Sequence, residues 1–223
     1  MQPKLLPIAV VVTVACALAT AGCTKKTDDH YEGKVKSNEP SVTPPGATPN
    51  ASNPQVVLKT SLGNIHVELL ADKAPITVKN FLRYVDDKFY DNTIFHRVIS
   101  NFMIQGGGMT TDLQKKPTRA AIKNEADNGV SNTRGTLAMA RTKHPDSATA
   151  QFFINVKDSA HLNHRGPGRL FGYCVFGRVI KGMDVVEKIR YTPTRREGML
   201  THLPIKTVVI LQARRLKQGP AAK

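Results

Sequence analysis

Short runs of strand-forming residues recur along most of the chain, and they constrain the fold more than any other feature of the sequence. The first two runs flank Leu62 and Gly63, which is the pattern of a β-hairpin. Together with two isolated helical segments, the runs predict a mainly all-β domain, a closed antiparallel eight-stranded β-barrel capped by two α-helices. The eight predicted strands are residues 55–61, 64–70, 93–98, 102–105, 136–140, 151–155, 173–179 and 205–214.

The two helical segments are recognised by their apolar spacing. The first, residues 77–89, follows Pro75, a residue that favours the first turn of a helix. The second, residues 182–190, is shorter. Each segment has one apolar stripe, which we expect to face the barrel. The stripes consist of Val78, Phe81, Leu82, Val85 and Phe89 in the first helix, and of Val185, Val186 and Ile189 in the second.

The N-terminus has the pattern of a processing signal. Lys4 precedes an apolar run at residues 5–19, which is too short and too rich in alanine for a membrane span. Residues 19–21 fit the small-x-small site of ordinary secretion, whereas residues 20–23 resemble a bacterial lipobox, with Thr20 where Leu is usual. We favour the second interpretation. It predicts a signal peptide at residues 1–22, a lipid on Cys23 and a place on the periplasmic side of the cell envelope.

The segment that follows is rich in polar residues and proline. Residues 23–54 contain five prolines and too little apolar surface to fold, so we expect a disordered linker behind the lipidated cysteine. The folded domain is predicted at residues 55–216, followed by a flexible tail at residues 217–223. Of the three cysteines, Cys16 would be removed with the signal peptide and Cys23 would be acylated, which leaves Cys174 as the one free thiol. No disulfide is therefore expected, and Cys174, inside an apolar run, is predicted to be a buried hydrophobe rather than a nucleophile.

Charge and motifs restrict the possible chemistry. The formal net charge of +15 would attract acidic partners. Nucleic acid is not expected, because tryptophan is absent and no dense basic run alternates with aromatic residues. The glycines at 106–108 lack the Gly-Lys-Ser/Thr of a phosphate loop, and there is no Gly-x-Ser-x-Gly. His161 and His164 are predicted to be solvated loop residues, so neither a metal nor another cofactor is expected.

The segment FHRVISNFMIQGGG, residues 95–108, combines an arginine, an amide and apolar residues at strand spacing. Alternation places Met103 and Gln105 on one wall. Arg97 is expected to face a cleft, because a permanent charge is rarely buried. His96 is expected to point away from the face of Phe95 and Arg97 and to make a structural hydrogen bond.

A second segment, residues 137–155, reads LAMARTKHPDSATAQFFIN, and in it Phe152 is expected to face the core, opposite Phe153. Together the two segments resemble the active-site signatures of the cyclophilin family of peptidyl-prolyl isomerases, and most closely its bacterial periplasmic members. The resemblance implies the cyclophilin-type barrel and a monomeric enzyme without cofactor. Its substrates would be unfolded or extended envelope proteins that contain proline.

The resemblance also implies roles for individual residues. Arg97 would donate to the prolyl nitrogen, and Gln105 would orient Arg97. The remaining residues would bind the peptide. Phe102, Met103, Phe153 and Leu162 would form a slot for the proline ring, the main chain at Ala140, Arg141 and Thr142 would pair with the peptide backbone, and Gln151, His161 and Tyr173 would line the neighbouring surface.

Three of these positions depart from the usual family residues. His161 stands in place of Trp, Tyr173 in place of His and Arg141 in place of Asn. None of the three is the proposed donor, so activity is expected to survive. Two other classes remain open: a non-catalytic module that holds proline-containing segments in the same groove, and a basic envelope protein that binds acidic polymer.

Overall fold

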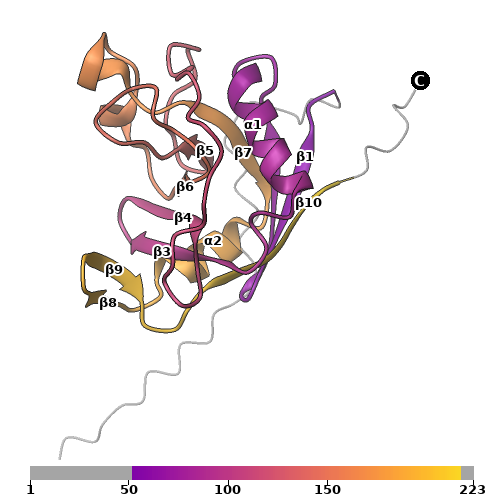
Figure 1. The fold of residues 1–223 in the computed structure, drawn as a ribbon, viewed down its shortest axis with the longest axis vertical. Coiled ribbons are helices and arrows are strands. Elements are labelled where there is room, and N and C mark those ends of the chain that lie inside the picture. Colours follow the sequence, from indigo (N-terminus) through magenta and orange to yellow (C-terminus); the bar gives the residue numbers. More distant parts are fainter. Residues whose placement is uncertain (1–51, 217–223) are drawn as a thin grey trace, which may run out of the picture. The chain divides into compact units, whose positions relative to one another are not determined.

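The computed structural model describes residues 52–216, which form a closed antiparallel barrel (Figure 1). The strand order around the barrel is β1-β10-β3-β4-β6-β5-β7-β2, so the eight predicted strands and the barrel are confirmed. The signal peptide, Cys23, most of the linker and the C-terminal tail lie outside the described residues. The eight barrel strands are β1 (Gln55–Thr60), β2 (Gly63–Leu69), β3 (Thr93–Ile99), β4 (Met103–Thr110), β5 (Thr136–Met139), β6 (Phe152–Asn155), β7 (Val175–Lys181) and β10 (Val209–Arg215).

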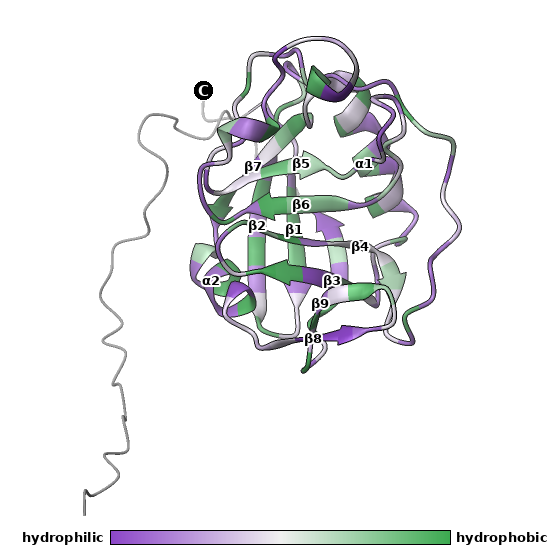
Figure 2. Ribbon diagram, turned by 90° about the vertical axis from the view of Figure 1, so that its left-hand side faces the viewer, coloured by the Kyte–Doolittle hydropathy of each residue, from purple (hydrophilic) through white to green (hydrophobic). Residues whose placement is uncertain are grey.

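Two helices on opposite sides of the barrel complete its core (Figures 1 and 2). Helix α1 (Pro75–Asp86) begins at the proline itself and ends three residues earlier than predicted. Lys88 has a φ of 56°, a left-handed conformation that cannot continue a helix. Phe89 nevertheless packs against the core from the following turn. Helix α2 (Met183–Arg190) buries Val185, Val186 and Ile189, as its spacing predicts.

The barrel interior is built around aromatic rings. Phe152 is fully buried, as predicted, and its ring lies edge-on to three others, with centroids 5.6 Å from Phe81, 5.6 Å from Tyr90 and 6.4 Å from Phe95. Edge-to-face contacts of this kind add to the stabilisation from buried area. Cys174 is buried beside this core, and burial raises the pKa of its thiol to about 11. It is therefore the inert hydrophobe that the sequence indicates.

A second, two-stranded sheet was not predicted. Strands β8 (Thr194–Glu197) and β9 (Leu200–Pro204) pair with each other, and β10 begins only at Val209 rather than at residue 205. All four residues of β8 are exposed. They are also polar, as the purple ribbon in Figure 2 shows. A strand with no buried face carries no apolar alternation, so β8 could not be predicted from the pattern of apolar residues.

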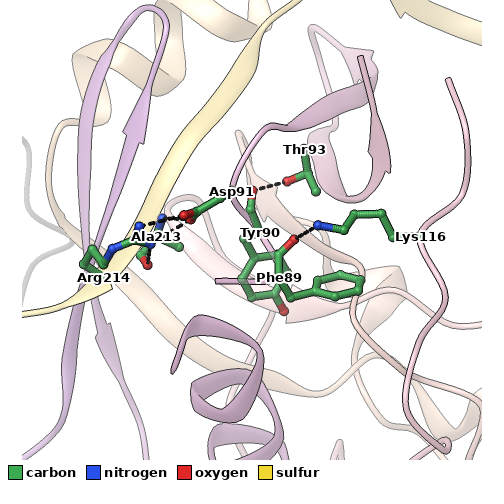
Figure 3. A network of polar contacts seen from close by, with 7 residues as sticks. All are labelled: Phe89, Tyr90, Asp91, Thr93, Lys116, Ala213 and Arg214. Carbon is green, nitrogen blue, oxygen red and sulfur yellow. Dashed lines mark hydrogen bonds and ion pairs between the residues drawn. The ribbon is translucent and has the colours of Figure 1, made fainter. Parts of the chain in front are cut away.

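Ion pairs join segments that are distant in the sequence. Asp91, in the turn before β3, accepts hydrogen bonds at 2.7 and 2.6 Å from the guanidinium of Arg214 on β10 (Figure 3). Glu68 on β2 is fully buried and pairs with Arg178 on β7 at 2.8 Å. Asn53 and Pro54, which the sequence assigns to the linker, also bond to β2: Asn53 donates to Glu68 at 3.0 Å, and the Pro54 carbonyl accepts from Leu69.

None of the described helices is long and apolar enough to cross a membrane. Two short 3₁₀ turns, η1 (Ala160–Leu162) and η2 (Gly168–Phe171), lie in the long connection between β6 and β7. This connection and the end of β5 supply several of the residues described next.

Candidate active site

The apolar residues expected to bind proline form a cluster outside the barrel core. Along β6, Phe152 and Ile154 point into the barrel, whereas Phe153 joins the separate cluster. On β4, Met103 belongs to the same separate cluster, whereas its neighbour Ile104 lies in the barrel core. The cluster, called the apolar slot below, contains Met103, Phe153 and Leu162 with exposures of 1, 4 and 8%, the buried Ala138 and Val175, and the partly buried Leu70, Ile99, Phe102, Val130, Ala140 and Tyr173.

Arg97 lies next to the slot because β3 contains an irregularity. The pairing of β3 with β4 shifts between Phe95 and Arg97, and Phe95 lies in the barrel core. Without the shift, alternation would place Phe95 and Arg97 on one face; this prediction from the sequence was wrong. A β-bulge changes the direction of the side chains that follow it. Arg97 is thus directly opposite Gln105, which is opposite Phe153 on β6.

Three polar side chains form a hydrogen-bonded chain beside the slot, called the relay below. Nη1 of Arg97 donates to Oε1 of Gln105 at 3.3 Å, and Nε2 of Gln105 donates to Oε1 of Gln151 at 3.0 Å. The part of the chain that the structure describes offers Arg97 no carboxylate. A guanidinium has five N–H donors, so this arrangement orients the group while leaving donors for a ligand.

Two glycines of β4 make room for this relay and for the core below it. A Cβ on Gly108 would lie 2.4 Å from Cγ of Gln151, closer than non-bonded atoms approach. Gly107 has a φ of +77°, and its Cβ would lie 2.8 Å from the ring of Phe152. These glycines therefore serve close packing. Their motif excludes a phosphate loop, but this packing role was not predicted from it.

The main chain after β5 is open to a ligand. The N–H of Ala140 donates to the carbonyl of Gln151 at 2.9 Å, and that of Thr142 donates to the hydroxyl of Ser147 at 2.9 Å. Between them, the N–H and C=O of Arg141 have no hydrogen-bond partner among residues 52–216. An unpaired stretch of extended backbone is a template for an added strand.

The remaining predicted residues surround the slot. The exposed ring of His161 lies 5.5 Å from that of Phe102, which belongs to the turn before β4 and not to a strand. Tyr173 packs edge-on against Phe153 with ring centroids 5.7 Å apart, and the Arg141 guanidinium lies 4.6 Å from the Tyr173 ring. The structure thus brings all twelve predicted residues around one surface. Five members of the slot were missed: Ala138, Val175, Leu70, Ile99 and Val130. Ala138 and Val175 each lie two residues from a predicted one.

The described residues contain no cluster of three or more His, Cys, Asp or Glu side chains that could hold a metal ion. His164 lies 2.9 Å from the Phe171 carbonyl through Nδ1. Both His161 and His164 are exposed, and the His161 ring packs against Phe102.

His96 is a buried histidine next to Gln151. It is 6% exposed, and its Nδ1 has no hydrogen-bond partner within residues 52–216, so the expected structural hydrogen bond is not made by this atom. Burial lowers the pKa of His96 to about 4 and outweighs the opposing effect of the Ile94 carbonyl, while the charge of Arg97 lowers it further. The imidazole is therefore neutral beside Gln151 at neutral pH.

This depressed pKa predicts acid sensitivity. The unfolded chain takes up a proton at His96 near pH 6.5, whereas the folded chain does so only near pH 4. Stability from this group is therefore complete above pH 6.5 and falls as the pH is lowered towards 4. Between pH 7.5 and 5 the free energy of unfolding should drop by about 2 kcal/mol more in the wild type than in His96→Gln.

Urea denaturation at both pH values measures this difference. His66→Gln is the control, since burial lowers the pKa of His66 too, but this side chain is only partly buried. Equal pH dependence of the wild type and His96→Gln would contradict the assignment.

Comparisons with known proteins agree with this geometry. Residues 55–215 match the family described as "Cyclophilin type peptidyl-prolyl cis-trans isomerase/CLD". The chain is 59% identical over 160 residues to a peptidyl-prolyl cis-trans isomerase of Acinetobacter baylyi, a match that covers 72% of this chain and 84% of that protein. It is 56% identical over 156 residues to peptidyl-prolyl cis-trans isomerase B of Escherichia coli, covering 70% of this chain and 95% of the relative.

Solved structures give the same result. A cyclophilin type peptidyl-prolyl cis-trans isomerase of Cryptosporidium parvum superposes with a TM-score of 0.61 at 27% identity, over 74% of this chain and 98% of that chain. A crystal structure of the same isomerase in the presence of the dipeptide Ala-Pro gives a TM-score of 0.60 at 28% identity, over 72% and 97% of the two chains.

Proposed function

Because the chain belongs to the cyclophilin-type peptidyl-prolyl cis-trans isomerase family and is an enzyme of that class, we propose that Arg97 is its catalytic donor. The substrates are proline-containing polypeptides. The observation that carries the assignment is the position of Arg97, held by Gln105 beside an apolar slot that is separate from the barrel core.

The chemistry requires no covalent step. Rotation about an X–Pro bond breaks amide resonance, with a barrier of about 18–20 kcal/mol. As resonance is lost, the prolyl nitrogen becomes pyramidal and regains a lone pair that can accept a hydrogen bond. A donor placed at that nitrogen stabilises the twisted state more than either planar isomer, which is what accelerates a reaction. Arg97 supplies this donor, and the Gln105–Gln151 relay holds it in place.

The other site residues bind the substrate. Phe102, Met103, Phe153 and Leu162 hold the proline ring, and burial of that apolar ring contributes about 25 cal/mol per Å². The unpaired main chain of Arg141 hydrogen-bonds the peptide backbone on one side of the ring. Every group in this proposal comes from one chain, so we propose that the enzyme acts as a monomer.

A proline-isomerisation assay on a short, uncharged peptide tests the proposal. Acceleration of cis-to-trans conversion, dependent on Arg97, is expected. A non-catalytic module that uses the same groove would bind the peptide without changing its rate. Measuring binding and isomerisation of the same peptide separates the two functions.

We also propose that the protein is anchored to the cell envelope by a lipid on Cys23 and that it acts on unfolded or extended envelope proteins. The sequence of residues 1–23 supports this, since a signal-like segment ends in a lipobox-like sequence. The polar, proline-rich residues that follow would span on the order of 30 Å as a coil, enough to separate a domain from a membrane.

The anchoring proposal predicts a change of fraction. Wild-type protein should sediment with membranes, because two or more acyl chains bind stably. Cys23→Ser should abolish this sedimentation, whereas Cys16→Ser should behave as wild type. Mass spectrometry of the mature N-terminus completes the test. Wholly soluble wild-type protein that begins at Gly22 would establish ordinary secretion instead.

A further inference from the structure

A cavity with a positively charged lining lies next to the apolar slot and shares Tyr173 with it. It has a volume of about 550 Å³ and is lined by Arg141, Thr142, Lys143, Arg169 and Tyr173. Three of these five residues are cations and none is acidic. The cavity is formed where the open main chain after β5 meets the connection between β6 and β7.

The cation closest to the slot is held by neutral groups. Nε of Arg141 donates to the Gly172 carbonyl at 2.8 Å, and Nη1 donates to the Thr142 carbonyl at 2.9 Å. Its guanidinium also lies over the Tyr173 ring. These contacts fix the position of the charge without neutralising it.

The other two cations are equally uncompensated. Lys143 and Arg169 are exposed and form no ion pair within residues 52–216. Asp146, the acidic residue nearest to Lys143 in the sequence, forms no ion pair with it and accepts from the N–H of Asn124 at 2.8 Å. Seven other described arginines do pair with carboxylates: Arg119, Arg134, Arg178, Arg190, Arg195, Arg214 and Arg215. The cavity is therefore a place where positive charge lacks a partner.

The distance from the slot fits a peptide side chain. Tyr173 lies between the two sites, with its ring 5.7 Å from Phe153 and 4.6 Å from the Arg141 guanidinium. Phe153 and the Arg141 guanidinium are therefore at most on the order of 10 Å apart, a span of up to about three residues of extended chain. A peptide paired with the main chain of Arg141 would carry its side chains across the cavity.

We propose that this cavity is a specificity subsite for an acidic side chain, Asp or Glu, within about three residues of the substrate proline. Lys143 and Arg169 are the specificity-determining residues, and Arg141 adds a fixed charge. The proposal rests on the proposed function, because it places the proline in the apolar slot. Exposed ion pairs are individually weak, so the preference should be moderate and should decrease with salt.

A peptide series tests the proposal. Each peptide contains one proline and carries Glu or Gln at one of the three positions on either side, and kcat/KM is measured at low salt and at about 0.5 M salt. At one position or more, the Glu peptide should be used roughly fivefold better than its Gln partner at low salt. In Lys143→Ala/Arg169→Ala this ratio should fall towards one, while the rate on Gln peptides stays unchanged.

A matched control separates the cavity from the net charge. Lys59→Ala/Lys206→Ala removes the same charge at two exposed positions elsewhere on the domain and should keep the preference. Equal use of Glu and Gln peptides by the wild type at low salt, or equal loss of preference in both double variants, would overturn the proposal. Failure to isomerise even the Gln peptides would refute the proposed function instead. Binding of the same peptides, measured by fluorescence anisotropy, would then decide whether the cavity prefers Glu.

Discussion

Arg97→Ala is expected to lower kcat about ten- to two-hundred-fold, with little change in KM for an uncharged peptide. A hydrogen bond from a charged donor contributes about 1.5–3 kcal/mol, which corresponds to that range of rates. Because the bond to the prolyl nitrogen forms only as resonance is lost, its removal affects the transition state and not the bound peptide. Steady-state isomerisation kinetics and peptide binding, measured on the same preparations, check both parts.

Arg97→Lys should restore little of this activity. A lysine ammonium is a point charge on a flexible stem, and it cannot reproduce a planar guanidinium held by the Gln105 amide. Both variants should remain folded by circular dichroism, because Arg97 lies outside the barrel core and has no ion pair within residues 52–216. Near-wild-type turnover in both variants would remove Arg97 from the mechanism and favour a binding module.

Glu68→Ala is expected to lower the free energy of unfolding by about 3–5 kcal/mol. Glu68 is fully buried and pairs at 2.8 Å with Arg178, whose side chain is 18% exposed. Removing the carboxylate deletes the acidic member of a mostly buried ion pair, and this costs more than the pair contributes when it is intact. Urea denaturation measures the loss.

Two further variants show whether pairing is the reason. Glu68→Leu/Arg178→Met replaces both charges with apolar groups and should be less destabilising than Glu68→Ala, because no buried charge is left alone. Asp184→Ala breaks an exposed pair with Lys188 and should change stability by less than about 1 kcal/mol. A double variant as unstable as Glu68→Ala would mean that packing, and not charge, decides the effect.

The sequence determined most of the barrel. All eight of its strands were predicted, because each is a short run of strand-forming residues that burial selects. In β1 buried and less buried residues alternate, whereas β5 and β6 are buried at every residue and are short, mainly apolar runs. The β8–β9 hairpin was not predicted, because β8 is exposed throughout. The start of β10 was placed four residues early, since Ile205 and Lys206 are exposed and outside any strand. Local pattern thus locates an element only where burial imposes the pattern.

The site shows the same division. Two short segments contain Arg97, Gln105 and Phe153 in a combination specific enough to indicate the family and the residues around its slot. Phe152 and Phe153 were assigned to opposite faces by alternation alone, and Phe152 does lie in the core. Regular geometry is what makes such assignments possible.

Only the tertiary structure decided where alternation fails and what distant segments build together. The shift in pairing between Phe95 and Arg97 turns the arginine out of the barrel. No residue type in this segment predicts the shift. The cationic cavity joins Arg141 to Arg169, which are 28 positions apart and belong to different connections. The burial that keeps His96 neutral also comes from its neighbours in space. A sequence records the periodicity of one segment, whereas charge, desolvation and distance between segments exist only once the chain has folded.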